Sequence, residues 1–275
     1  MLKVLVILIL LVVSNSAPAQ GIVVLNYHRV ISHPVEGASP GPTVVTADVF
    51  EEQMRWLKDS NYTTITVSQL AEYMNNPTSS PPSPSDRVIV ISFDDGWLDQ
   101  YENAIPILSK YGFVATFNIV ASFPSNRPNY MNWEQIRNLK YLGHEIGSHM
   151  EFHLDNPTPE QARSGIIQSK QIIERQISDR IDTIAWPHGI FNPQMIDQAE
   201  GVGFTSAQTI DQNWCELGQV AQDGTLSCNQ HTGNAAHQPP YLMKRVFVSG
   251  TCSLSQFALV VQRGHTDGCL TAETK

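Results

Sequence analysis

Apolar runs rich in β-branched residues recur along the chain and are separated by longer amphipathic segments. Such runs predict buried strands, and apolar positions at helical spacing predict helices. Because strands that alternate with helices favour a parallel sheet or barrel, we expect an α/β fold. The predicted strands cover residues 22–27, 63–66, 87–93, 114–120, 145–148, 182–186 and 204–207.

Three of the predicted helices carry clear start signals. Thr46 can cap a helix in which Phe50 and Leu57 share one face. Asn132 and Thr158 are each followed three residues later by Gln, which is the pattern of a capping box. The predicted helices cover 46–59, 68–74, 97–111, 132–142, 158–177 and a segment that begins at 192.

Two stretches lack these patterns. The prolines and serines of residues 75–86 cannot build a helix or a central strand, so we predict a surface loop within one domain. After residue 208 the strand–helix alternation fades, and loops held by disulfide bonds are expected there.

The first 19 residues predict a secretory signal peptide. Lys3 precedes an apolar run over 4–13, and Ala17 and Ala19 give a small-x-small cleavage pattern. An uncleaved membrane anchor is the alternative, but the run is short for a bilayer span. We therefore expect a mature domain over 20–275 that has no transmembrane segment and is exported, to the periplasm or the extracellular medium.

All four cysteines fall in the last quarter of the chain, and their even number in an exported protein predicts two disulfides. Pairing neighbours along the chain closes the shortest loops. A zinc site is the alternative, but no C-x-x-C pair supports it. The predicted pairs are Cys215–Cys228 and Cys252–Cys269.

The charge balance argues against one class of partner. Asp and Glu number 26 against 17 Lys and Arg, which gives a formal net charge of −9. Phosphate backbones are bound mainly by Lys and Arg, so nucleic acid is excluded as an expected partner. No feature of the sequence indicates a protein partner.

Two polar motifs follow predicted strands. Asp94 and Asp95 come directly after the strongest apolar run, where two carboxylates are costly unless paired, hydrated or metal-bound. An ordinary Asp-Gly turn is the alternative reading. His149 and His153 are four residues apart after another strand, so both rings can reach one ion. Together the motifs predict a metal site with a spare carboxylate as base.

The motifs resemble those of the polysaccharide deacetylase family, which shares the NodB-homology domain. Residues 91–96 (ISFDDG) are similar to its first motif, T-F-D-D-G, and residues 149–153 to its second, H-[ST]-x-x-H. Residues 27–30 (YHRV) and 185–189 (AWPHG) resemble the branch that acts on poly-N-acetylglucosamine. The similarity extends from about residue 22 to 204, with fainter echoes near Arg245.

The resemblance implies a distorted (β/α)7 barrel with a single catalytic domain, and a role for each motif residue. Zn2+ or another divalent transition metal is the expected cofactor, and an N-acetylated polysaccharide is the expected partner. Trp186 and Tyr27 are expected to line the sugar site, with a core position as the alternative for Trp186. The implied metal ligands are Asp95, His149 and His153, with Asp94 as general base and the backbone N–H of His188 as oxyanion donor.

The sequence departs from the family pattern at three places. Met150 replaces the usual Ser or Thr after the first ligand histidine, which removes a bracing hydrogen bond. Ala185 stands where many members have an Arg that orients the base. A C-terminal L-x-x-H motif, which often supplies the general acid, is absent around His231, His237 and His265, so His28 or protonated Asp94 is the expected acid.

These observations predict a hydrolase that removes N-acetyl groups from an amino-sugar polymer, with β-1,6-linked, β-1,4-linked and peptidoglycan substrates all open. A carbohydrate-binding pseudoenzyme is the alternative, because of the missing Arg and C-terminal His. A glycosidase using Asp94 and Asp95 is disfavoured, since adjacent residues rarely give the carboxyl separation that glycoside cleavage needs.

Asp95→Ala is expected to abolish deacetylation, because the variant loses the only carboxylate in the implied ligand set. The measurement is acetate release together with the metal content of the purified variant. Full activity in Asp95→Ala would contradict the ligand assignment.

Overall fold

The structure is a computed structural model that describes residues 22–33, 41–75, 87–210 and 243–263. The signal peptide, most of the loop predicted over 75–86, and His231, His237 and His265 lie outside these ranges. So do Cys215, Cys228 and Cys269. Cys252 is described and buried, and it is not a free thiol, while the predicted disulfide pairs stay a prediction.

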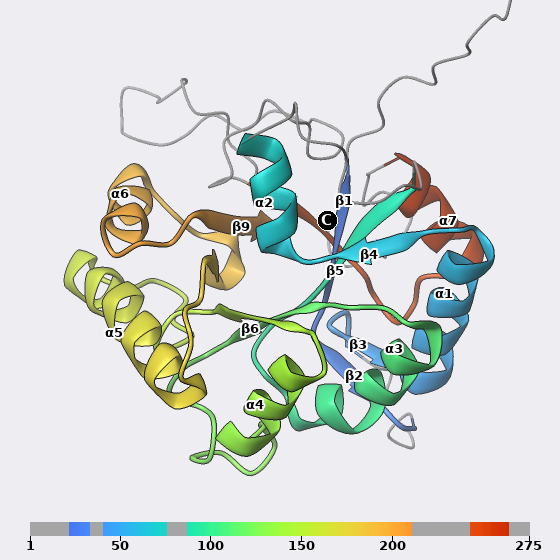
Figure 1. The fold of residues 1–275 in the computed structure, drawn as a ribbon, viewed down its shortest axis with the longest axis horizontal. Helices are drawn as coiled ribbons and strands as arrows, with labels where there is room; N and C mark the ends of the chain where they lie inside the picture. The colour runs from blue at the N-terminus through green and yellow to red at the C-terminus, as the bar shows by residue number, and fades with distance from the viewer. Residues whose placement is uncertain (1–21, 34–40, 76–86, 211–242, 264–275) are drawn as a thin grey trace, which may run out of the picture.

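Seven parallel strands form a closed barrel with helices outside it, which confirms the predicted (β/α)7 fold (Figure 1). Strand β1 closes the ring, because it pairs with β5 on one side and with β10 on the other. Around the ring the strands are β1 (Val23–Tyr27), β10 (Met243–Phe247), β9 (Ser206–Ile210), β8 (Thr183–Ala185), β7 (Glu145–Ser148), β6 (Thr116–Ile119) and β5 (Val88–Phe93).

An eighth strand of the same sheet distorts the barrel. Strand β4 (Thr63–Ile65) pairs with the first half of β5, at residues 88–90, whereas β6 pairs with Ser92 and Phe93 at its end. The two strands therefore share one edge of β5, with β4 wedged at the amino end. A short pair outside the barrel, β2 (Arg29–Ile31) with β3 (Val44–Thr46), completes the described strands.

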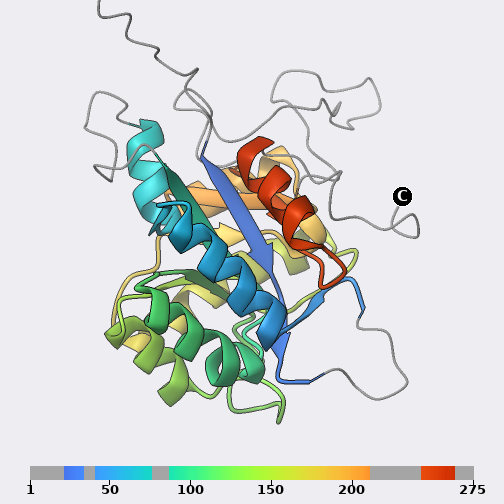
Figure 2. The ribbon, with the colours of Figure 1, turned by 90° about the vertical axis from the view of Figure 1, so that its right-hand side faces the viewer.

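The predicted helix starts are confirmed. Thr46 caps α1 through its side chain, and Asn132 and Thr158 form capping boxes at α4 and α5. Figure 2 shows α7 lying beside α1, where Phe257 meets Trp56 edge to face with ring centroids 5.9 Å apart. The helices are α1 (Ala47–Asp59), α2 (Val67–Asn75), α3 (Ile105–Tyr111), α4 (Trp133–Tyr141), α5 (Pro159–Ile177), α6 (Pro193–Gly201) and α7 (Leu254–Arg263).

The structure refines one expectation about secondary structure and shows that another is wrong. The helix predicted over 97–111 has a π-helical turn at Gln100–Ala104 before α3, and Pro106 sits in the first turn of α3, where its missing N–H is tolerated. Loops were expected after residue 208, yet β9 continues to Ile210, and β10 and α7 follow further along. The sequence MKRVF hides β10, because two adjacent cations break the apolar run that marks a buried strand.

Alternation along the strands separates an outer core from the barrel interior. Leu25 and Tyr27 belong to the main apolar cluster with Phe50 of α1, whereas Val24 lies in a second cluster with Leu70 of α2. Asn26 lies between Leu25 and Tyr27 in the sequence, and its side chain instead donates a hydrogen bond to Asp94 across the barrel interior. This two-residue period decides which side chains of each strand can reach a site at the barrel mouth.

The buried ring of His144 is expected to make the stability of the folded protein depend on pH. Its ring is 5% exposed, accepts a hydrogen bond from the Ala115 N–H, and has its pKa lowered to about 4 by burial. Above pH 6.5 the histidine is neutral in both folded and unfolded chains. As the pH falls from 6.5 towards 4, only the unfolded chain takes up the proton, so the free energy of unfolding falls by about 1 kcal/mol per pH unit.

His144→Asn keeps an acceptor near Nδ1 but does not titrate. In urea unfolding at pH 4.5 and 7, the variant is expected to lose less stability than the wild-type protein over this interval. Equal losses in both proteins would show that His144 does not titrate across folding.

Candidate metal and active site

A tight turn after β5 brings both carboxylates of the first motif to the barrel mouth. The Asp94 N–H still donates to the Tyr27 carbonyl at 3.0 Å, which continues the strand pairing. Asp95 and Gly96 then adopt left-handed backbone conformations, with φ of 74° and 79°. Aspartate tolerates this region better than most residues. A Cβ on residue 96 would lie 3.1 Å from a side-chain carbon of Ile119, so a glycine fits there best.

The histidine motif follows β7 and contains another left-handed residue, Met150, with φ of 64°. Ser148 Oγ accepts the Met150 N–H at 3.0 Å and contacts Ser169 Oγ of α5 at 2.8 Å. The loop is therefore braced from Ser148, on the other side of His149. This contact compensates for the Ser or Thr hydroxyl that Met150 lacks.

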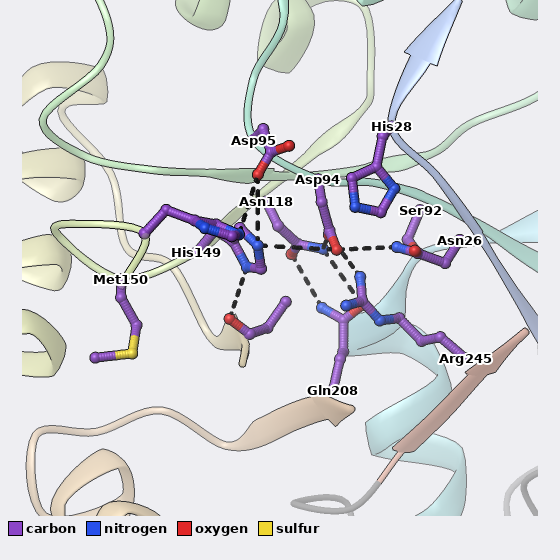
Figure 3. A network of polar contacts seen from close by, with 12 residues as sticks. Asn26, His28, Ser92, Asp94, Asp95, Asn118, His149, Met150, Gln208 and Arg245 are labelled. Atoms are coloured by element: carbon purple, nitrogen blue, oxygen red, sulfur yellow. Dashed lines mark hydrogen bonds and ion pairs between the residues drawn. The ribbon is translucent and has the colours of Figure 1, made fainter. Parts of the chain in front are cut away.

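The three predicted metal ligands converge on one point, and Figure 3 shows two of them, Asp95 and His149, facing each other. Asp95 Oδ1 lies 3.6 Å from His149 Nε2 and 3.7 Å from His153 Nε2, and the three ligand atoms all fall within 4.8 Å of one another. Asp95 Oδ1 is buried and has no hydrogen-bond partner. One carboxylate and two imidazoles suit a divalent transition metal with open coordination positions. The donor set therefore fits the cofactor that the sequence predicted.

The surroundings of both histidines suit them to bind an ion through Nε2. His149 is fully buried and its Nδ1 lies 2.8 Å from the Ala185 carbonyl, so Nδ1 carries the proton and Nε2 is left for a ligand. Burial and the neighbouring His149 lower the pKa of His153 to about 4, although Asp95 opposes the shift. Metal binding requires the neutral form that this environment favours.

Asp94 sits in a cage of hydrogen-bond donors. Its Oδ1 accepts from Arg245 Nη1 at 2.5 Å and from Asn118 Nδ2 at 2.8 Å, and its Oδ2 accepts from Asn26 Nδ2 at 3.0 Å (Figure 3). Burial alone would raise the pKa of Asp94, but the Arg245 guanidinium, with smaller effects from the rings of His149 and His28, outweighs it and holds the pKa well below its usual range. The carboxylate is therefore ionised and oriented.

A second layer of amides fixes this cage. Gln208 Nε2 donates to Asn118 Oδ1 at 3.0 Å and to Thr183 Oγ1 at 3.1 Å. With its oxygen engaged in this way, Asn118 turns its amide nitrogen towards Asp94. A Cβ on Gly147 would approach Asn118 Oδ1 to 2.5 Å, so the packing beside Asn118 also requires a glycine.

Arg245 is the functional residue that the sequence analysis missed. Ala185 lacks the arginine that orients the base in many family members, but Arg245 delivers a fully buried guanidinium to Asp94 from β10. The sequence did contain a signal for this role, because an arginine inside a short apolar strand needs an acidic partner. Without a predicted β10, nothing in the sequence directed that arginine into the barrel.

The remaining predicted catalytic residues lie close to the site. His188 has φ of 56° in the turn after β8, and its ring centroid is 4.4 Å from that of His153. Its Nε2 pairs with Asp155 Oδ1 at 2.8 Å. His28 lies beside Asp94, and its buried Nδ1 has no hydrogen-bond partner (Figure 3). The oxyanion role of the His188 N–H and the acid role of His28 stay predictions.

The structure corrects the two predicted sugar contacts. Tyr27 and Trp186 are both 0% exposed, so neither side chain is available to a polymer. The two-residue period of β1 turns Tyr27 outward from the barrel, where its hydroxyl donates to Gln53 at 2.8 Å. Trp186 belongs to the main apolar core and stacks against Phe191, as in the alternative reading.

Comparison with known proteins gives consistent matches. The polysaccharide deacetylase family model matches residues 82–207. YxkH of Bacillus subtilis, named for the same family, is 27% identical over 215 residues, which are 78% of this chain and 68% of that protein. The poly-β-1,6-N-acetyl-D-glucosamine N-deacetylase of Escherichia coli (strain K12) is 19% identical over 247 residues, and the match covers 74% of this chain but 36% of that enzyme.

A solved structure shows the same fold. The Streptococcus pyogenes deacetylase PplD superposes with a TM-score of 0.71 at 21% identity, covering 88% of this chain and 98% of that one. Fold and site thus define an α/β-barrel protein with a candidate metal centre at the carboxyl ends of its strands. The matches narrow this class further: the chain is similar to the polysaccharide deacetylase family, as its motifs predicted, and the relatives named for that family support the predicted deacetylase enzyme.

Arg245→Met tests the buried ion pair. Removing one partner leaves the Asp94 charge buried and uncompensated, so the free energy of unfolding is expected to fall by about 3 kcal/mol in urea titrations. The double variant Arg245→Met with Asp94→Asn is expected to regain part of that loss, because it buries no charge. Strictly additive effects of the two substitutions would contradict the coupling.

Proposed function

We propose that this protein is an exported, metal-dependent N-deacetylase of an N-acetylglucosamine polymer. The observation that carries the proposal is the convergence of Asp95, His149 and His153 beside Asp94, an ionised and oriented carboxylate. Export rests on the signal-peptide pattern of the first 19 residues. Among the described residues, no helix is long and apolar enough to cross a membrane.

Each residue of the site has a distinct task. Asp95, His149 and His153 would hold the ion, which when bound supplies Lewis-acid chemistry and lowers the pKa of water. Asp94 accepts the proton of the attacking water through Oδ2, the oxygen that Arg245 and Asn118 leave open. The cage keeps that oxygen pointed towards the ligand cluster, since Asp94 Oδ2 lies 4.0 Å from His149 Nε2.

The later steps use groups at the edge of the cluster. The backbone N–H of His188 stabilises the oxyanion that forms as the amide is attacked. The leaving amine needs a proton, which Asp94 can return after it has accepted one. His28 is the second candidate donor, because its ring lies beside Asp94 at the barrel mouth (Figure 3). The amine and acetate are then the products.

The substrate proposal comes from the relatives and from the surface beside the site. The Escherichia coli relative is named for poly-β-1,6-N-acetyl-D-glucosamine, so we place that polymer first, ahead of β-1,4-linked chains and peptidoglycan. Phe152 and Ile190 are 49% and 42% exposed, and both line an apolar cavity of about 200 Å³. They adjoin His153 and Gly189 in sequence, so we assign sugar contacts to them in place of Tyr27 and Trp186.

A carbohydrate-binding pseudoenzyme now has less support. One ground for it was the missing arginine at Ala185, and Arg245 supplies that charge to Asp94. The other ground, the missing C-terminal histidine, concerns residues outside the described ranges. A pseudoenzyme would bind sugar without releasing acetate, which the following assay detects.

The decisive assay is acetate release by the mature protein, from residue 20 onward, loaded with zinc. N-acetylglucosamine oligomers of β-1,6 and β-1,4 linkage are the two substrates. We expect release that stops on chelation and is faster with the β-1,6 oligomer. Sugar binding without acetate release, in zinc-loaded protein, would overturn the proposal.

Asp94→Asn is the matched control for this assay. The amide keeps the size of the carboxylate and leaves the three ligand side chains in place, but it cannot accept a proton. The variant is expected to bind zinc and to lose activity by a factor of 10² or more. Near wild-type turnover in Asp94→Asn would show that another group acts as the base.

A further inference from the structure

The two oxygens of the Asp95 carboxylate have different surroundings. Oδ1 is buried, lacks a hydrogen-bond partner and faces both histidine Nε2 atoms. Oδ2 accepts a hydrogen bond from the indole N–H of Trp97 at 2.9 Å. We propose that Trp97 is a positioning residue for the metal site, which reserves Oδ1 for the ion and keeps Oδ2 out of its coordination. This inference rests on the metal dependence proposed above.

The indole is itself held in place by its neighbours. Tyr130 stacks on Trp97 with ring centroids 4.2 Å apart and an interplanar angle of 25°. The guanidinium of Arg29 also lies over the Trp97 ring, at 4.8 Å from its centroid. Arg29 in turn is fixed by Asp99, whose Oδ2 is 2.7 Å from both Nε and Nη2. The direction of the indole N–H therefore does not depend on Asp95 alone.

The backbone reinforces the same arrangement. Trp97 and Tyr130 form an isolated antiparallel bridge. The Leu98 N–H donates to the Asn129 carbonyl and the Met131 N–H donates to the Gly96 carbonyl, both at 2.9 Å. These bonds clip residues 96–98 to residues 129–131, directly after the left-handed turn at Asp95. A conformation that costs energy at Asp95 is thus held by contacts outside the ligand set.

An open stacking platform for sugar is the other role that an aromatic pair beside a metal site suggests. It fits less well, because Tyr130 and Arg29 already lie against the Trp97 ring. Indole is also a donor only and does not titrate, which suits a fixed contact to a carboxylate oxygen. Holding Asp95 to one oxygen leaves coordination positions open for water and substrate, as a catalytic site requires.

Trp97→Phe tests the role, since phenylalanine retains an aromatic ring against Tyr130 but has no N–H. We expect the zinc dissociation constant, measured by competition with a chromophoric chelator, to rise about 10- to 100-fold. The visible spectrum of the Co2+-loaded variant should also change, because Oδ2 becomes free to bind. Trp56→Phe is the matched control. Trp56 packs on Tyr62 and Phe257, away from the site, and its substitution should leave both readouts unchanged.

Tyr130→Leu provides a second variant that keeps the N–H but removes its stacking partner. It is expected to weaken zinc binding less than Trp97→Phe does, and urea unfolding of both zinc-free variants establishes that they fold. A wild-type zinc affinity and Co2+ spectrum in folded Trp97→Phe would overturn the inference. Failure of the wild-type protein to bind zinc would instead overturn the proposed metal dependence, so the two failures are distinguishable.

Discussion

The buried ion pair between Arg245 and Asp94 is the interaction on which the site depends. Both side chains are removed from water, which is unfavourable for each charge alone and less so for the pair, and Asn118 and Asn26 donate further hydrogen bonds to Asp94. The pair joins the turn after β5 to β10, and β1 lies between these two strands in the ring. Barrel closure and orientation of the Asp94 carboxylate are therefore parts of one arrangement.

The polar interior follows from the alternation of side chains along parallel strands. Asn26, Asn118 and Gln208 come from β1, β6 and β9, and each points into the barrel mouth while its neighbours in sequence pack elsewhere in the core. Three non-glycine residues with positive φ lie at the same end. Asp95 and Met150, beside the ligand histidines, have positive φ, and His188 adds a third case. The rigid cores on either side of the strands hold these turns.

Many of the helices and strands, and the candidate metal ligands, could be predicted from local sequence. Caps at Asn132 and Thr158 are local signals, and the ligand set follows from residue types after predicted strands. Long-range placement could not be predicted. Strand β10 could not be recognised in the sequence because two cations interrupt its apolar residues. The burial of Arg245 is explained only by its contact with Asp94, which is distant in the sequence. The outward face of Tyr27 depended on the register of β1, and the contact of Trp97 with Asp95 depended on a turn conformation.

The order of the strands around the ring has a consequence for biogenesis. β10 is the last strand of the barrel in the chain, yet it lies between β9 and the first strand, β1. A nascent chain that ends before residue 243 lacks both the strand that closes the ring and the arginine that pairs with Asp94. Ring closure and the orientation of Asp94 therefore both wait for the synthesis of the same short segment. A truncated or stalled product would carry Asp95, His149 and His153 and still lack the guanidinium that orients Asp94.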